Sequence, residues 1–221
     1  ALQDVRYYLN GLLLELGPGS IRGVATDGHR LAISEISGTF ESQEVRQIIV
    51  PRKGVVELAR ILADSEEGIE IKFSENHIRA SLPGLSFTSK LIDGRYPDYR
   101  GVIPKVEENY LIADRNDLRQ ALIRASILSN EKFRGVRLIM EANLLTIQSN
   151  NPEQEEAEES LLVEYTGSPI ETGFNATYLL DALSALDGEQ VRLGFVNEQS
   201  SCLIESVQEP SSWYVVMPMR L

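Results

Sequence analysis

The sequence predicts an α+β protein built from two copies of one structural unit. Many short segments alternate apolar and polar residues, which is typical of antiparallel strands. A few segments instead carry apolar residues at helical spacing. The order of these strands and helices recurs in the second half of the chain, which indicates a repeated unit. We therefore expect antiparallel sheets packed against a small number of helices.

Composition narrows the class of protein. The chain has 221 residues, of which 43% are hydrophobic and 24% are charged, as in ordinary globular proteins. The single cysteine, Cys202, excludes an internal disulfide framework and a multi-cysteine zinc site, and it suits a reducing compartment. No apolar run approaches the roughly 20 residues that a membrane-spanning helix requires.

The net charge of −12 is unevenly distributed. Lys and Arg number 12 against 14 Asp and Glu in residues 1–104, and 9 against 19 in residues 105–221. An acidic second half argues against tight, sequence-independent binding of nucleic acid, which depends on basic side chains that neutralise phosphates. It favours a basic protein partner or simply contributes to solubility.

The first copy is predicted to begin with strands and continue through one helix. We expect strands at 5–16, 21–25, 31–36, 48–50, 69–73, 77–82 and 85–92. The helix follows Pro51, a residue suited to a first helical turn, and places Val55, Leu58, Ala59 and Leu62 on one face. Two prolines, at 97 and 104, bracket a linker, which places the domain boundary after residue 104.

The second copy repeats this order after an additional strand and helix. We expect the additional strand at 110–113 and its helix at 115–128, then strands at 133–139, 144–149 and 160–165, a helix at 174–186, and strands at 191–196, 201–207 and 213–219. The helix at 174–186 corresponds to the one at 50–62. Because the first copy has no counterpart of 110–128, we expect the chain to lack roughly 25 residues of its first unit.

The stretch 25–32 combines turn chemistry with an apolar segment. Asp27 and Gly28 favour a turn, so His29 and Arg30 stand where that turn meets a strand. One interpretation makes Asp27 and His29 an oriented general base. We favour the other, a loop or binding rim, because the sequence shows neither a nucleophile nor a substrate cleft. With two histidines in the chain, a metal site is less expected still.

Two further features have an ordinary and a functional interpretation. The acidic tract 150–159 has the composition of a solvated loop, but the repeat alignment places it just before a strand, where it would form a charged rim. Ile123 and Ile127 form an i,i+4 pair away from the apolar stripe of their helix. Such a pair is either scattered surface hydrophobicity or part of a protein interface.

A set of motifs identifies a family resemblance that covers nearly the whole chain. The motifs are 25–32 (ATDGHRLA), 87–91 (FTSKL), 93–99 (DGRYPDY), 127–136 (ILSNEKFRGV), 151–159 (NPEQEEAEE) and 214–221 (YVVMPMRL). In this order they resemble the bacterial DNA polymerase III β subunit family, the replicative sliding clamps. One departure is Gly101, since family members often have Arg after the Asp-Tyr-Arg run.

The resemblance implies a fold and an assembly. Family members have three copies of one unit, and two subunits join head to tail in a ring around duplex DNA, with helices on the inner face and antiparallel sheets outside. Residues 1–104 would be the middle clamp domain, truncated at its N-terminus, and residues 105–221 the C-terminal clamp domain. A head-to-tail homodimer is expected at full length, whereas this chain is expected to be monomeric.

The resemblance also implies a function without chemistry. It indicates a cytoplasmic, non-catalytic processivity factor that uses no cofactor and no metal, and that has no membrane partner. Its implied partners are DNA polymerase subunits, the clamp loader and repair polymerases, all bound through short linear peptides of the Gln-x-x-Leu-Phe type. Duplex DNA would be held only by the full ring.

Three sets of residues follow from the resemblance. The peptide-binding set comprises Leu9, Thr26, Gly28, His29, Arg30, Leu31, Pro97, Val102, Asn175, Tyr178, Ser201, Val215, Val216, Met217, Pro218, Met219, Arg220 and Leu221. The DNA-binding set comprises Gln3, Tyr7 and Tyr8. The dimer-interface set comprises Ile127, Leu128, Glu153, Glu155, Glu156, Glu158 and Glu159.

Two other function classes remain open at this point. The chain could be a protein-interaction module that never meets DNA, or, less favoured, a hydrolase built on Asp27 and His29. Peptide binding combined with DNA retention by the full ring distinguishes a clamp from a plain interaction module. Turnover that is abolished by His29→Ala would support the hydrolase.

Overall fold

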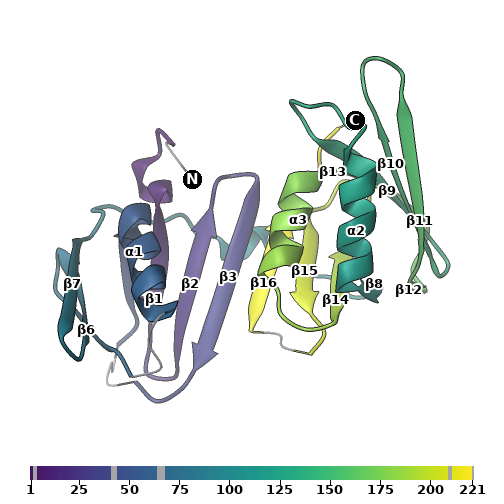
Figure 1. Ribbon diagram of the computed structural model, residues 1–221. Coiled ribbons are helices and arrows are strands. Elements are labelled where there is room, and N and C mark those ends of the chain that lie inside the picture. The colour runs from purple at the N-terminus through teal and green to yellow at the C-terminus, as the bar shows by residue number, and fades with distance from the viewer. Residues whose placement is uncertain (2–3, 41–43, 64–67, 209–210, 221) are drawn as a thin grey trace. The chain divides into compact units, whose positions relative to one another are not determined.

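The computed structural model describes residues 1, 4–40, 44–63, 68–208 and 211–220. Its strands are antiparallel and its helices are short, so the predicted α+β class is confirmed (Figure 1). Contacts divide the chain into two compact units. Unit 1 contains residues 1–28 and 33–98, and unit 2 contains residues 29–32 and 99–221.

The described residues of unit 1 form two antiparallel sheets and one α-helix. Its elements are the 3-10 helix η1 (Tyr7–Asn10), β1 (Gly11–Leu16), β2 (Ser20–Thr26), β3 (Arg30–Ser37, whose first three residues belong to unit 2), β4 (Arg46–Pro51), α1 (Arg52–Ala63), β5 (Glu70–Phe73), β6 (His77–Leu82) and β7 (Leu85–Lys90). The strand orders are β3-β2-β1-β4 and β5-β6-β7. The helix follows β4 directly.

The core of unit 1 is organised around β1. Leu13 lies opposite Val24 of β2 on one side and Ile49 of β4 on the other, and all three side chains are buried. The buried carboxylate of Glu15 accepts a hydrogen bond from Gln47 at 2.6 Å and lies 3.5 Å from the guanidinium of Arg22. A carboxylate can be buried here because polar partners on the neighbouring strands compensate for the loss of water.

Unit 2 follows the same plan with additional elements. They are the 3-10 helix η2 (Arg100–Val102), β8 (Asn109–Asp114), α2 (Arg115–Ser126), β9 (Gly135–Glu141), β10 (Leu144–Asn150), β11 (Glu156–Leu162), β12 (Glu164–Tyr165), β13 (Ile170–Asn175), α3 (Ala176–Ala185), β14 (Gln190–Phe195), β15 (Cys202–Ser206) and β16 (Ser212–Val216). Their strand orders are β12-β8-β14-β15-β16 and β11-β10-β9-β13. The order β1 to β7 with α1 thus recurs as β9 to β16 with α3, apart from the additional two-residue strand β12, and is preceded by β8 and α2.

The two α-helices of unit 2 lie side by side against its sheets (Figure 1). Their apolar stripes are buried as the sequence predicts, with Leu118 and Leu122 on α2 and Leu179 and Leu183 on α3. Arg115 joins the helices, because its guanidinium donates to the carbonyls of residues 183 and 186 at 3.3 and 3.1 Å. These carbonyls lie at the end of α3, where helix carbonyls lack intrahelical partners.

The predicted boundaries are wrong at several places, each for a local reason. Residues 7–10, predicted as strand, form η1, because the side chain of Asn10 exchanges two hydrogen bonds with the backbone of Asp4 and folds that segment back. Strand β13 was missed and α3 begins two residues later than predicted, because Asn175 ends the strand and caps the helix. The last predicted strand, 213–219, stops at Val216.

Three further boundaries differ in the region between α2 and β12. Helix α2 ends at Ser126, so Leu128 lies beyond the helix on which it was predicted. Strand β9 starts at Gly135 because Arg134 adopts a positive φ of 49°, which strands exclude. Strand β11 starts at Glu156, four residues before the prediction, and the predicted strand to residue 165 is interrupted at Val163.

Candidate functional site

The turn that begins the predicted site belongs to unit 1 and is stabilised by a residue that sequence reasoning missed. Thr26 accepts a hydrogen bond from the amide of Gly28 at 3.1 Å, and Gly28 has a φ of +89°. Arg6 lies against this turn, since a Cβ on Gly28 would come 2.9 Å from its guanidinium. Glycine is therefore favoured here by its backbone conformation, whereas the guanidinium, as the end of a flexible side chain, could move away from a larger residue.

Arg6 is itself held in place. Its guanidinium donates two hydrogen bonds to the carboxylate of Asp4, at 2.9 and 2.7 Å. The hydrogen bonds from Arg6 lower the pKa of Asp4 to about 2, so the carboxylate stays charged even in moderate acid. In the sequence, only the short spacing between Asp4 and Arg6 suggests that they pair. That spacing does not indicate that Arg6 lies next to Gly28.

The other predicted peptide-site residues of unit 1 differ in exposure. Leu9 is buried on η1, and Pro97 is exposed. Next to Pro97, burial raises the pKa of the Tyr96 hydroxyl to about 12. Leu9 therefore belongs to the packed interior of this region, and Pro97 lies on its surface.

Unit 2 brings several of its predicted residues into direct contact. The carbonyl of His29 accepts a hydrogen bond from the amide of Met217 at 2.9 Å, which fixes the residues after β16 beside the 29–32 segment. The guanidinium carbon of Arg30 lies 4.4 Å from the ring centre of Tyr178 on α3. Arg30 also pairs with Asp181 at 2.5 Å. His29 is exposed, whereas Leu31 is buried.

Asn175 performs two structural roles at the start of α3. Its side-chain oxygen accepts hydrogen bonds from the amides of Thr177 and Tyr178, at 2.9 and 3.3 Å, which is the geometry of an N-cap. Its side-chain nitrogen donates to the carbonyl of Phe133 at 3.0 Å. Asn175 thus sets the position of Tyr178 one helical turn later.

The end of β16 and the segment after it carry apolar side chains on a fixed backbone. Val215 and Val216 are buried, Met217 is 50% exposed, and Pro218 and Met219 are half-buried. The amide of Met219 donates to the carbonyl of Gly173 at 2.8 Å. Of the remaining predicted residues, Arg220 and Val102 are exposed and Ser201 is half-buried, and Leu221 lies outside the described residues.

From Glu156 onward the acidic tract belongs to strand β11, and its side chains do not all point to the same face of the sheet. Glu159 pairs with Arg124 of α2, whereas Glu158 accepts a hydrogen bond at 2.8 Å from Gln148 of β10. Glu155 is bound by Asn151, and Glu153 is exposed. Successive side chains of a strand point to opposite faces, so the tract contacts both faces of its sheet.

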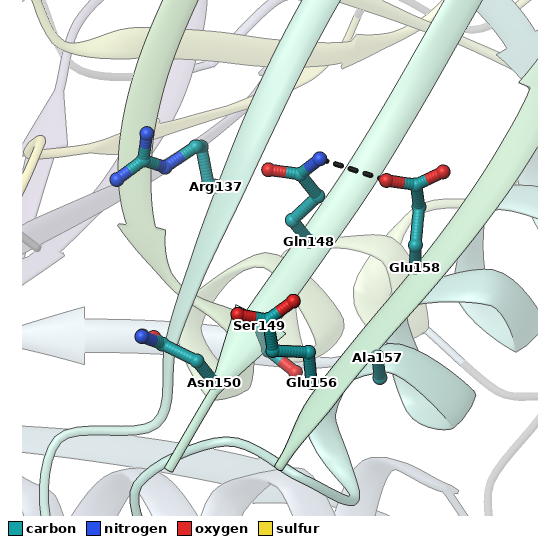
Figure 2. Close-up of a pocket in the computed structure, with 8 residues that line it drawn as sticks. Arg137, Gln148, Ser149, Asn150, Glu156, Ala157 and Glu158 are labelled. Carbon is teal, nitrogen blue, oxygen red and sulfur yellow. Dashed lines mark hydrogen bonds between the residues drawn. The ribbon is translucent and has the colours of Figure 1, made fainter. Parts of the chain in front are cut away.

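The outer side of this sheet carries a polar groove of about 540 Å³. Figure 2 shows Arg137, Gln148 and Glu158 on neighbouring strands, with the hydrogen bond from Gln148 to Glu158. Strand β11 is the end member of the order β11-β10-β9-β13. Of the two predicted interface residues that follow α2, Ile127 is 70% exposed and Leu128 is half-buried.

The structure describes two of the three residues predicted to bind DNA. Tyr7 is 58% exposed, and its ring makes an edge-type contact with the Tyr8 ring at a centroid distance of 5.6 Å. Both lie on η1 rather than in a strand, and Gln3 lies outside the described residues.

The described part of the chain brings together no group of three or more His, Cys, Asp or Glu side chains that could hold a metal ion. The helices in that part are all too short or too polar to cross a membrane.

Comparison with known proteins gives consistent matches. Residues 1–98 match the family described as DNA polymerase III beta subunit, central domain, and residues 100–220 match the C-terminal domain of the same subunit. The chain is 52% identical over 221 residues to the beta sliding clamps of Pseudomonas putida and Escherichia coli K12. It covers 60% of the length of each relative, and each match covers the whole chain.

Solved structures agree with the sequence matches. The DNA polymerase III subunit beta of Pseudomonas aeruginosa superposes with a TM-score of 0.97 at 52% identity, over all of this chain and 60% of that one. A structure of the Pseudomonas aeruginosa clamp bound to griselimycin gives a TM-score of 0.96 with the same coverage and identity.

Proposed function

Because the chain belongs to the DNA polymerase III beta subunit family, we propose that it acts as part of a DNA sliding clamp, a non-catalytic tether for replication proteins. One observation carries the proposal: the chain matches beta sliding clamps along its whole length at 52% identity. Since it spans 60% of the length of those relatives, the ring around DNA is a property proposed for the full-length subunit. Residues 1–104 and 105–221 would be its middle and C-terminal domains.

The proposed activity of this chain is to bind short linear peptides. In unit 2, His29 and Met217 share a backbone hydrogen bond, and Arg30 lies on Tyr178, so four of the proposed contact residues already have fixed positions. The exposed side chain of Met217 offers a flexible apolar surface, which suits anchors of varied shape. Buried residues of the set, such as Leu31 and Val216, would support the site from below rather than touch the peptide.

The proposed ring joint uses the edge of β11 and the exposed Ile127. An end strand has unpaired backbone groups along one side, which is a common point of association between chains. Carboxylates on this strand would add charge complementarity with a basic partner surface. A head-to-tail joint needs two different faces, and the 221-residue chain is proposed to supply one of them. We therefore expect this chain to be monomeric in light scattering at micromolar concentration. A stable dimer would contradict this joint.

Contact with DNA is proposed for Tyr7, Tyr8 and Gln3. The exposed Tyr7 suits such a surface, because an aromatic ring with a hydroxyl can meet both sugar and phosphate. With a net charge of −12, the chain alone should bind duplex DNA only weakly and in a salt-sensitive way. Retention of the 221-residue chain on circular duplex DNA at physiological salt would contradict the expectation of weak binding.

Calorimetric titration with a peptide of the Gln-x-x-Leu-Phe type tests the peptide-binding proposal. We expect saturable one-to-one binding, which disappears when the Leu-Phe pair of the peptide is changed to Ala-Ala. The matched control protein is Leu162→Ala, which removes an exposed apolar side chain from β11, away from the proposed site. The proposal would be overturned if the two peptides bound equally well, or if the Gln-x-x-Leu-Phe peptide did not bind.

A further inference from the structure

We infer that the loop 130–134 is a second contact region of the proposed peptide site, where an exposed phenylalanine and two cations select peptides with acidic flanking residues. The inference rests on the proposed function, because it concerns which peptides are preferred at that site. The loop belongs to the motif 127–136, of which only Ile127 and Leu128 have an expected role. Its residues are Asn130, Glu131, Lys132, Phe133 and Arg134.

The loop lies directly beside the start of α3. The carbonyl of Phe133 accepts a hydrogen bond from the side chain of Asn175 at 3.0 Å. The carbonyl of Arg134 accepts one from the amide of Ala176 at 2.8 Å. Asn175 belongs to the proposed peptide site and also caps the amide of Tyr178, a second member of that site. The loop therefore adjoins the proposed site within unit 2.

The segment after β16 reaches the same end of β13. The amide of Met219 donates to the carbonyl of Gly173, two residues before Asn175. Two residues of a strand span about 7 Å. A peptide held along the segment 217–220 would therefore need only a short flank to reach the loop 130–134.

Hydrogen bonds hold the loop backbone at both ends. The side-chain oxygen of Asn130 accepts hydrogen bonds from the amides of Lys132 and Phe133, at 3.0 and 3.2 Å. Its carbonyl accepts one from the amide of Arg134 at 2.8 Å. Together with the two bonds to the start of α3, these contacts order the backbone before a peptide arrives. An ordered loop has less conformational entropy to lose when a complex forms.

The side chains of this loop are exposed, although one of them is a large aromatic. Phe133 is 53% exposed, and its neighbours Lys132 and Arg134 are exposed as well. The ammonium of Lys132 lies 5.2 Å from the centre of the Phe133 ring. Aromatic side chains are enriched in protein-binding regions relative to the rest of the surface. The loop thus presents apolar area and positive charge together.

The charge of the loop is opposite to that of the domain around it. The loop 130–134 contains two basic residues and one acidic residue, and the exposed Arg220 adds a third positive charge. Residues 105–221 as a whole contain 9 basic and 19 acidic residues. Among the described residues, Lys132 and Arg134 form no ion pair. An acidic peptide residue can therefore pair with them without displacing a carboxylate of the protein.

Calorimetric titration tests the inference with peptides of the Gln-x-x-Leu-Phe type that carry two Asp or two Asn residues before or after the motif. At low salt the parent should prefer Asp to Asn on one flank by about 2- to 10-fold, the range of two exposed ion pairs, and the preference should decline at high salt. Lys132→Gln combined with Arg134→Asn should abolish the preference. Asn is chosen because it tolerates the positive φ of residue 134.

Two further variants separate charge from structure. Lys132→Arg keeps the charge and should retain the preference for Asp. Arg119→Gln removes one cation that donates to Ser184, near the other end of α3, and should leave the preference unchanged. A loop that served only the fold would not change the ratio of the two affinities in any of these proteins.

Phe133→Ala should weaken binding of the preferred Asp peptide and its Asn counterpart by the same factor, about 3- to 10-fold, because it removes apolar contact area and no charge. The inference alone would be overturned by equal affinities for Asp and Asn peptides on both flanks, by a preference that survives loss of both cations, or by unchanged affinity in Phe133→Ala. A parent that binds none of these peptides would overturn the proposed function and this inference together.

Discussion

Arg124 of α2 donates two hydrogen bonds to the carboxylate of Glu159 on β11, at 2.9 and 2.8 Å. The bidentate contact connects a helix to the end strand of the neighbouring sheet. Hydrogen bonding by Arg124 lowers the pKa of Glu159, and the carboxylate raises the pKa of Arg124 in return. Glu159 of the acidic tract thus attaches β11 to α2.

The lowered pKa of Glu159 predicts a dependence of stability on pH. Because the carboxyl has a lower pKa in the folded than in the unfolded chain, its contribution is present above its ordinary pKa of 4.5. The contribution is lost as the pH falls through the folded pKa. Glu159→Gln should therefore lower the melting temperature slightly at neutral pH and have no effect in strong acid.

Thermal melts at neutral and acidic pH measure this difference. The matched control is Glu158→Gln on the same strand, where the partner is the neutral amide of Gln148. A Glu159→Gln penalty that persists unchanged at the lowest pH would show that the charge of the carboxylate is not responsible.

The helices of unit 2 were predictable because helical periodicity is local. Leu118 and Leu122, or Leu179 and Leu183, stand four residues apart, and the spacing alone indicates a buried face. Strand β13 was missed because its pairing is not local. Phe174 lies opposite Val136 of β9, and the short strand joins α3 without an intervening loop, so its sequence resembles the start of the helix.

The candidate site was predictable where turn chemistry or family motifs supplied the signal. Asp27 and Gly28 indicate a turn from residue type alone, and Gly28 does have a positive φ. The contacts that support the site are long-range and have no such signal. Arg6 on the Gly28 turn and Asp181 at Arg30 join residues far apart in the chain, so they required the structure.

Asn175→Ala should destabilise unit 2. The substitution removes the N-cap of α3 and the hydrogen bond to Phe133, which together should cost about 1–2 kcal/mol of unfolding free energy. Urea denaturation measures the loss. Thr177→Ala, an exposed neighbour in the same helical turn, is the control and should change stability by less than about 0.5 kcal/mol. Equal stability of Asn175→Ala and the parent would refute the capping role.

Cys202 should be unreactive in the native protein. Its side chain is fully buried on β15, and burial raises the pKa of the thiol, so the reactive thiolate is rare. A chromogenic thiol reagent should modify it only as fast as the protein unfolds. Cys202→Ser should cost about 1–3 kcal/mol, because a hydroxyl replaces a thiol in an apolar core. Rapid modification under native conditions would contradict the buried position.

Gly101→Arg tests the departure from the family motif. A Cβ at Gly101 would meet no atom within 4 Å, so the substitution should change stability by less than about 0.5 kcal/mol. If this position forms a polar wall of the site, an added guanidinium should strengthen binding of a Gln-x-x-Leu-Phe peptide about 2- to 10-fold, the range of one hydrogen bond. Gly101→Met, similar in length and uncharged, is the control. Identical affinities for the two variants would mean that the wall is not polar.

Deletion of residues 219–221 should separate peptide binding from folding. The amide of Met219 donates to Gly173, so the deletion should cost the fold about 0.5–1.5 kcal/mol, the net value of one hydrogen bond. Strand β16, which ends at Val216, and the buried Val215 and Val216 remain. Peptide affinity should fall by at least about tenfold, because burial of one apolar anchor contributes about 1.5–3 kcal/mol. Calorimetry of the deleted protein with a Gln-x-x-Leu-Phe peptide, alongside a thermal melt, measures both effects. The control is Leu162→Ala, which removes an exposed leucine elsewhere in unit 2 and should leave affinity unchanged. If the deleted protein binds as tightly as the parent, the peptide anchors lie elsewhere, and the contacts of Met217 and Tyr178 become the next positions to test.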